Sequence, residues 1–272
     1  MDWMKGTNKI DAFRTVANEL VQRISHIDSV EGIVYIGGLA RGFADKYSDV
    51  DIIVLLNNED PYARDFLPSI SANLEDKSNL ELDLEIYSLE KFERQEWNEY
   101  QKWDLSHSAI AFDRQGKVNR LLKEKLTLND EEWRVRISKA IIYFSWYCSA
   151  FDESTPTMID LWMDRGDVSS AEYSVNYGIE LILDLVYSLN RSFLPAPKWR
   201  IGYTRSLEWL PDDFEQHIRE AMICKEISDA DTRRRVTGLK NMWPEILKKA
   251  EKEFGLNRDE VRRIYIKEVY EI

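Results

Sequence analysis

YIGGLARGFADKYSDVDIIVLL, residues 35–56, is the stretch that decides the fold. It has Gly37 and Gly38 after a short apolar segment, and Asp49 and Asp51 before a longer one. Residues i and i+2 of a strand face the same side, so the two carboxylates are predicted to lie together. Two unpaired anions repel, and one of them keeps its proton unless a divalent cation is bound. Oxygen ligands favour Mg²⁺ or Mn²⁺ for that role.

Each half of this stretch also has a simpler interpretation, because an isolated D-x-D is commonly a solvated strand end and an isolated Gly-Gly a turn. The presence of both, the Gly-Gly and the D-x-D, between two apolar strands favours a site that binds a metal ion and phosphate. Gly37 and Gly42 have the spacing of a phosphate loop, but Phe43-Ala44 stands where that loop needs Lys and Ser or Thr. The sequence contains no G-x-G-x-x-G pattern, and apolar residues after Asp51 exclude a calcium loop.

Period-two and helical patterns alternate through the first part of the chain. The segment 80–88 alternates leucine or isoleucine with Glu81, Asp83 and Glu85, which predicts a half-buried strand with an acidic face. The predicted strands are 32–36, 50–56, 80–88 and 109–112, and the predicted helices are 9–28 and 62–76.

From about residue 117 the apolar period stays near 3.6. One helix is expected to begin at Asn129 or Asp130, and another at Ser169 or Ser170. Further helices are predicted over 211–224, 229–254 and 258–270. The sequence therefore predicts an α+β protein in which a mixed sheet with flanking helices, residues 1–115, precedes an all-α domain, residues 116–272.

Composition narrows the functional classes. The chain has 49 acidic and 37 basic residues and a net charge of −12, and such a surface repels a phosphate backbone, which disfavours general binding to nucleic acid. Two separate cysteines, Cys148 and Cys224, suggest neither a disulfide framework nor a thiolate metal site. With no signal-peptide pattern and no long apolar window, a cytoplasmic protein without a membrane partner is expected.

A family resemblance follows from the motif Gly37-Gly38, ten residues, Asp49-Val50-Asp51. It resembles the signature of the polymerase-β-type nucleotidyltransferases. Ala40-Arg41-Gly42 and Ser48-Asp49 are similar to small bacterial and archaeal members, including aminoglycoside adenylyltransferases. The resemblance implies a nucleotidyltransferase-type sheet, ATP as substrate and Mg²⁺ (or Mn²⁺) held by catalytic carboxylates.

The resemblance also implies roles for residues near the motif. Gly37, Gly38, Arg41 and Ser48 are expected to bind the nucleotide, although many relatives have Ser where this chain has Gly38. For Arg41 two roles stay open: neutralising phosphate charge, or clamping a neighbouring aspartate, Asp45 or Asp49.

The third metal-binding carboxylate is expected on the strand 80–88, together with Asp49 and Asp51. Glu81, Asp83 and Glu85 share one face, so parity does not choose among them. The number of strand residues that follow the acid in many relatives favours Asp83, whereas the aminoglycoside adenylyltransferases favour Glu81. Asp83 is therefore predicted to complete the catalytic, metal-binding set with Asp49 and Asp51.

The helical half carries a second resemblance in LNRSFLPAPKWRIGYTRSLEWLP, residues 189–211. This segment is similar to the Pro-Lys step in the second domain of aminoglycoside adenylyltransferases, where the lysine reaches the triphosphate. Lys198 would take that role and so bring the helical domain to the nucleotide and acceptor cleft. The alternative is a solvent-facing lysine after a Pro-Ala-Pro turn.

The expected activity is transfer of a nucleoside monophosphate, AMP from ATP, to a hydroxyl of a small molecule with release of pyrophosphate. Three alternatives remain open. The acceptor could be a protein, or a tRNA end, which the acidic composition disfavours. The chain could also be a nucleotide-binding regulatory or antitoxin-like module that has lost turnover.

Overall fold

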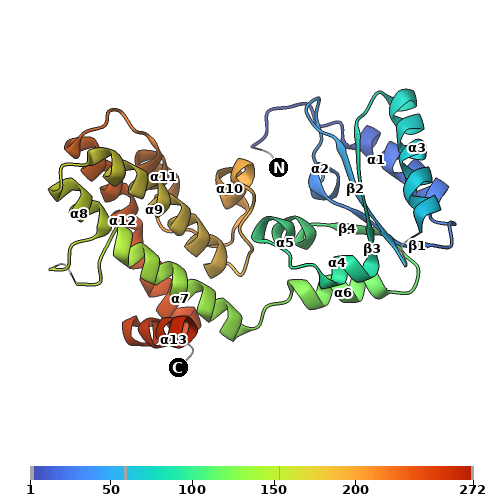
Figure 1. The fold of residues 1–272 in the computed structure, drawn as a ribbon. Helices are drawn as coiled ribbons and strands as arrows, with labels where there is room; N and C mark the ends of the chain where they lie inside the picture. The colour runs from blue at the N-terminus through green and yellow to red at the C-terminus, as the bar shows by residue number, and fades with distance from the viewer. Residues whose placement is uncertain (1–2, 58–59, 153, 271–272) are drawn as a thin grey trace. The chain divides into compact units, whose positions relative to one another are not determined.

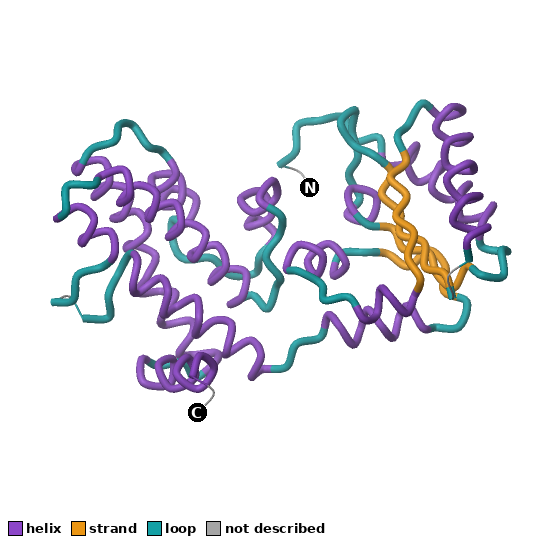
Figure 2. Tube along the Cα trace, in the orientation of Figure 1, coloured by secondary structure: helices purple, strands orange, loops and turns teal. Residues whose placement is uncertain are grey.

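The computed structural model of the chain describes residues 3–57, 60–152 and 154–270. It divides into two compact units, Met1–Thr127 and Leu128–Ile272. All the strands lie in the first unit, and the second consists of helices and loops in its described residues (Figure 2). The α+β fold class predicted from the sequence is confirmed.

The sheet of the first unit has four strands in the order β3-β2-β1-β4. The strands are β1 (Val30–Tyr35), β2 (Val50–Leu56), β3 (Leu82–Ser88) and β4 (Ala109–Asp113). β1 pairs antiparallel with β2 and β4, whereas β2 and β3 run parallel, so the sheet is mixed. β2 therefore lies between two neighbours, and β3 forms an edge.

The central strand β2 is apolar at both parities because both of its faces are covered. Ile52 and Val54 pack into one apolar cluster with α1 (Ile10–Ile24) and α3 (Pro61–Ser78). Ile53 and Leu55 pack into a second cluster on the other face. That face is covered by α4 (Leu89–Arg94), α5 (Glu99–Ser106) and α6 (Lys117–Leu126) (Figure 1). The result is a sheet between two helical layers.

The expected domain boundary at residue 115 falls immediately before α6. This helix places Val118, Leu121 and Leu122 in the same apolar cluster as Val34 of β1. α6 therefore packs as part of the first unit, and the division between units follows it, at Thr127.

The second unit is built around the long helix α9 (Val168–Leu189), which packs against α7 (Asp130–Tyr147), α8 (Met158–Asp164) and α12 (Asp229–Phe254). α13 (Arg258–Tyr270) packs against α7, and α11 (Phe214–Met222) packs against α12. The remaining described elements of this unit are α10 (Pro197–Tyr203) and the 3₁₀ turn η1 (Thr204–Ser206). No helix among the described residues is long and apolar enough to cross a membrane.

Two of the expected helix starts can be compared with the structure. Asn129 caps α7, its side chain accepting a hydrogen bond from Glu132 N at 3.0 Å while Glu132 bonds back. The expectation that Ser169 or Ser170 begins α9 is wrong, because Asp167 is the capping residue. Its carboxylate accepts hydrogen bonds from both the backbone N (2.9 Å) and Oγ (2.7 Å) of Ser170. A carboxylate at this position also favours the helix dipole.

Candidate functional site

Three carboxylates meet where β2 begins. Asp49 directly precedes the strand, Asp51 is its second residue, and Asp83 pairs with Asp51 in the parallel register of β3. One carboxylate oxygen of each residue lies within 4.8 Å of the other two. Since Asp51 has the parity of Ile53, its side chain lies on the sheet face that α4–α6 cover.

The parallel register separates the three acids of β3, which parity alone leaves equivalent. Asp83 is level with Asp51, and its carboxylate is the one that joins the group. Glu85 lies two residues further along the strand, a shift of about 6–7 Å, and accepts a hydrogen bond from Tyr87 Oη. Glu81 precedes β3 and is exposed. The structure thus places Asp83, rather than Glu81 or Glu85, beside the pair.

The surroundings of Asp51 alter the ionisation of its carboxyl group. Burial is the main cause that raises the pKa of Asp51 from 3.8 to about 7. The negative charges of Asp49, Asp104 and Asp83 act in the same direction, and the positive charge of Arg41 opposes them. A divalent cation bound to these oxygens would replace the proton as the neutralising charge, so the donor set fits Mg²⁺ or Mn²⁺.

Gly37 is required by the position of the Asp51 carboxylate. Its φ is +59°, in the left-handed region, and a Cβ there would lie 1.7 Å from Asp51 Oδ2. Gly38 is constrained by the backbone, because a Cβ would lie 2.5 Å from the carbonyl oxygen of Phe43. The short helix α2 (Gly37–Arg41) can therefore begin against the carboxylate only if both residues lack side chains.

Ser48 belongs to the turn that leads into β2. Its Oγ accepts a hydrogen bond from Asp45 N at 3.0 Å, and Asp45 Oδ1 accepts one from Tyr47 N at 3.0 Å. These bonds close the turn over residues 45–48 and fix the approach of the chain to Asp49. In this structure Ser48 thus has a structural partner, and its expected contact with nucleotide stays a prediction.

Arg41 connects α2 to α5. Its guanidinium forms an ion pair with Asp104 and lies 4.9 Å from the ring centroid of Trp103, and only 6% of the side chain is exposed. Asp104 was not among the partners suggested by the sequence. Loss of one partner of a buried ion pair destabilises the folded protein strongly. Arg41 therefore has a structural role, in addition to any contact that it makes with phosphate.

The sequence interpretation missed Trp103 and Asp104 because α5 was not predicted. The helix is short, and its apolar residues do not mark one continuous face. A signal was nevertheless present: Asn98 and Gln101 form a capping box, in which each side chain bonds to the other residue's backbone N. That pattern would have placed a helix start at residue 99.

Lys198 is the second residue of α10, in the second unit, and follows Pro197 at the first position of the helix. Its side chain is exposed, and its Nζ lies 5.8 Å from the ring centroid of Trp199. Both features agree with a solvated lysine at a helix start. The role expected for Lys198 toward a triphosphate therefore stays a prediction.

Residues 16–127 match the family described as the nucleotidyltransferase domain. The first unit is a nucleotidyltransferase domain. The match confirms, for this part of the chain, the nucleotidyltransferase resemblance drawn from Gly37-Gly38 and Asp49-Val50-Asp51.

The solved structures that are similar to the chain include the following two. A nucleotidyltransferase-like protein from Exiguobacterium sibiricum 255-15 is 15% identical, with 89% of this chain and 77% of that chain covered and a TM-score of 0.44. A mutant of the toxin-antitoxin pair MntA-HpeT is 17% identical, with 47% of this chain and 94% of that chain covered and a TM-score of 0.31. Among curated proteins no match was found. At these scores neither structure bears on the activity of this chain.

The first prediction concerns the proton on Asp51 of the nucleotidyltransferase domain. Without metal, the folded state holds this proton up to about pH 7, whereas the unfolded state releases it near 3.8. Its contribution to the free energy of unfolding is therefore fully present below 3.8 and is lost as pH rises toward 7. Urea unfolding in EDTA should show wild type losing stability relative to Asp51→Asn across this window. A constant difference between the two proteins would contradict the prediction.

The second prediction concerns Gly37. Gly37→Ala should cost more than the roughly 1–2 kcal/mol of a left-handed alanine, because the methyl group also displaces the Asp51 carboxylate. Gly116→Ala is the matched control, since φ is +71° and no atom lies within 4 Å of the added Cβ. Chemical denaturation of both variants provides the measurement. Equal losses would show that the carboxylate imposes no constraint on residue 37.

Proposed function

We propose that the protein is a metal-dependent adenylyltransferase that moves AMP from ATP to a hydroxyl of a small molecule and releases pyrophosphate. The observation that supports this most directly is the convergence of Asp49, Asp51 and Asp83 beside a turn that requires glycine at residue 37. Transfer of a nucleotidyl group depends chiefly on positioning the two substrates and on neutralising the charge of the phosphates. These carboxylates would hold the metal ion that does both.

In this proposal Asp49, Asp51 and Asp83 hold Mg²⁺. The ion, when bound, would neutralise charge on the phosphates and on the attacking oxygen. Without it the crowded carboxylates retain a proton on Asp51 near neutral pH, so binding of metal releases that proton. Metal binding and ionisation of Asp51 are therefore coupled.

The three carboxylates differ in their access to an acceptor. Asp49 and Asp51 are partly buried, whereas Asp83 is exposed on the edge strand β3. An incoming hydroxyl can thus approach Asp83 most directly, and we assign to it the removal of the hydroxyl proton. Arg41, held by Asp104, keeps positive charge close to the site and favours ionised Asp51.

Binding and turnover test the proposal separately. Calorimetry should show ATP binding with Mg²⁺ or Mn²⁺ and much weaker binding in EDTA; equal affinities would contradict the metal site. Incubation with each labelled NTP, Mg²⁺ and a panel of hydroxyl acceptors should release pyrophosphate. Metal-dependent binding without release by any acceptor would favour the regulatory, antitoxin-like alternative, and labelling of an added protein would favour the protein-modifying one.

The third prediction ranks the acids of β3. Asp83→Asn should reduce turnover by about two orders of magnitude or more, because it removes a metal ligand and the proposed base. Glu85→Gln is the matched control on the same strand and should be nearly silent, since its carboxylate is already bonded to Tyr87. Glu81→Gln should lie between them. Full activity of Asp83→Asn together with loss in Glu81→Gln would move the assignment two residues upstream.

The fourth prediction concerns Lys198, for which the resemblance implies a triphosphate contact. Lys198→Ala should weaken ATP binding by roughly 1.5–3 kcal/mol if the ammonium makes a charge-assisted hydrogen bond. Lys252→Ala, which removes another exposed lysine of the same unit, should leave the dissociation constant unchanged. Equal affinity in both variants would assign Lys198 to the solvated helix start.

A further inference from the structure

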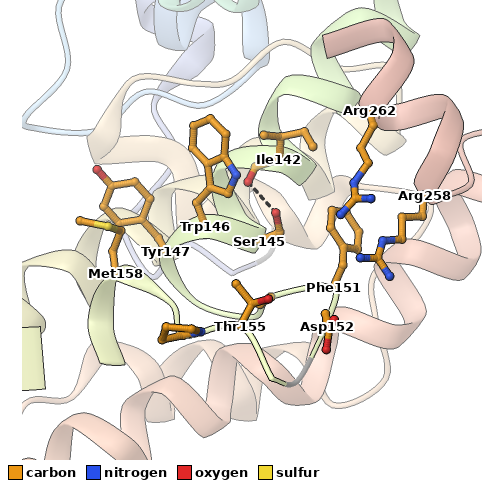
Figure 3. A pocket seen from close by; sticks show the side chains of 12 residues that line it. Ile142, Ser145, Trp146, Tyr147, Phe151, Asp152, Thr155, Met158, Arg258 and Arg262 are labelled. Carbon is orange, nitrogen blue, oxygen red and sulfur yellow. Dashed lines mark hydrogen bonds between the residues drawn. The ribbon is translucent and has the colours of Figure 1, made fainter. Parts of the chain in front are cut away.

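A pocket of about 370 Å³ lies within the second unit, apart from any residue used so far. Its wall includes the last turns of α7, the chain that leads to α8, and the first turns of α13 (Figure 3). The volume is in the range of small-molecule sites. The nucleotidyltransferase reaction as proposed makes no use of this pocket.

The pocket presents aromatic rings. Trp146 and Tyr147 come from the end of α7, and Phe151 from the following loop. Trp146 is 48% exposed although it is one of the largest apolar side chains, and it packs edge-on against Tyr143. Rings arranged around a cavity offer broad apolar faces to a flat ligand.

Two arginines of α13 supply positive charge on one side of the pocket. Arg258 and Arg262 are one helical turn apart, and their guanidinium carbons lie 5.4 and 5.9 Å from the ring centroid of Phe151. Figure 3 shows both side chains beside that ring. Two like charges over one ring repel each other, and an anion held by both would remove the repulsion.

These arginines differ from several others of the second unit, which pair with carboxylates. Arg134 pairs with Glu260, Arg136 with Asp184, Arg191 with Asp130, and Arg235 with Glu172. Among the residues that the structure describes, no carboxylate forms an ion pair with Arg258 or Arg262. In a chain with a net charge of −12, two adjacent guanidiniums that form no ion pair with a described carboxylate give this part of the described surface a local excess of positive charge.

Asp152 is the acidic residue among those described in the pocket wall, and it is already bonded locally. Its Oδ1 accepts hydrogen bonds from the backbone N (3.0 Å) and Oγ (2.8 Å) of Ser154. These bonds are the main causes that lower the pKa of Asp152, and the charge of Arg258 is the weakest. Its ionised carboxylate offsets part of the charge of Arg258, and the two guanidiniums still outnumber the one carboxylate of the described pocket wall.

We propose that this pocket binds a small anion that carries a planar ring. The ring would stack on Phe151 and Trp146, and a carboxylate or phosphate would be bound by Arg258 and Arg262, whose planar donor groups suit both anions. A nucleotide and an aromatic carboxylate share this chemistry. None of the residues that line this pocket has a part in the proposed transfer reaction.

Calorimetry on the full-length protein, in EDTA, tests the proposal with naphthoate as the ring-plus-anion probe. Naphthalenemethanol supplies the ring without the charge, and inorganic phosphate the charge without the ring. Naphthoate should bind at least about tenfold more tightly than either. Arg262→Gln should weaken naphthoate binding about tenfold or more, whereas Arg263→Gln, the neighbouring arginine that pairs with Glu260, should not change it.

ADP, also in EDTA, serves as the second probe and distinguishes the two sources of ligand. Competition between ADP and naphthoate identifies the pocket as a nucleotide site, and naphthoate binding without competition identifies it as a site for aromatic carboxylates. Absence of binding by both probes overturns the proposal. It is also overturned if naphthalenemethanol binds as tightly as naphthoate, or if Arg263→Gln costs as much as Arg262→Gln.

Discussion

The carboxylate of Asp51 occupies the space in which residue 37 would otherwise place a side chain, and the turn from β1 into α2 depends on that contact. A Cβ at Gly37 would lie 1.7 Å from Asp51 Oδ2, so the chain leaving β1 can turn beside the carboxylate only through glycine. The same contact buries Asp51 and so contributes to the raised pKa that burial produces. The glycine of the motif and its second aspartate are thus parts of one steric arrangement.

The charges that surround Asp51 determine which ion this site can bind. Asp49 and Asp83 add negative charge around Asp51, and Asp104 adds more from α5, while Arg41 opposes them. A site with this excess of carboxylates suits a divalent cation better than a proton, because the cation satisfies several oxygens at once. The second unit shows the reverse condition at Arg258 and Arg262, where positive charge lacks a carboxylate partner among the described residues. The first unit therefore has a group of carboxylates that suits a cation, and the second unit has a pair of arginines that suits an anion.

Much of the fold could be predicted because apolar periodicity is a local property. The alternation of 80–88, the apolar run of 50–56 and the long helical patterns of 229–254 and 258–270 correspond to β3, β2, α12 and α13. Short helices such as α4 and α5 were missed because few residues carry their pattern. The start of α9 was misplaced because Asp167 competes with two serines for the capping position, and the hydrogen bonds decide between them.

The sequence by itself determined that Asp49 and Asp51 lie on one face next to a glycine turn, because strand parity and glycine spacing are local. It also limited the predicted third acid to Glu81, Asp83 or Glu85. Only the tertiary structure shows that Asp83 is the one of these that lies beside Asp49 and Asp51, because this depends on the register of two strands about thirty residues apart in sequence, and no local pattern encodes a register. The pairing of Arg41 with Asp104 and the position of two arginines over Phe151 were likewise decided by packing between distant segments.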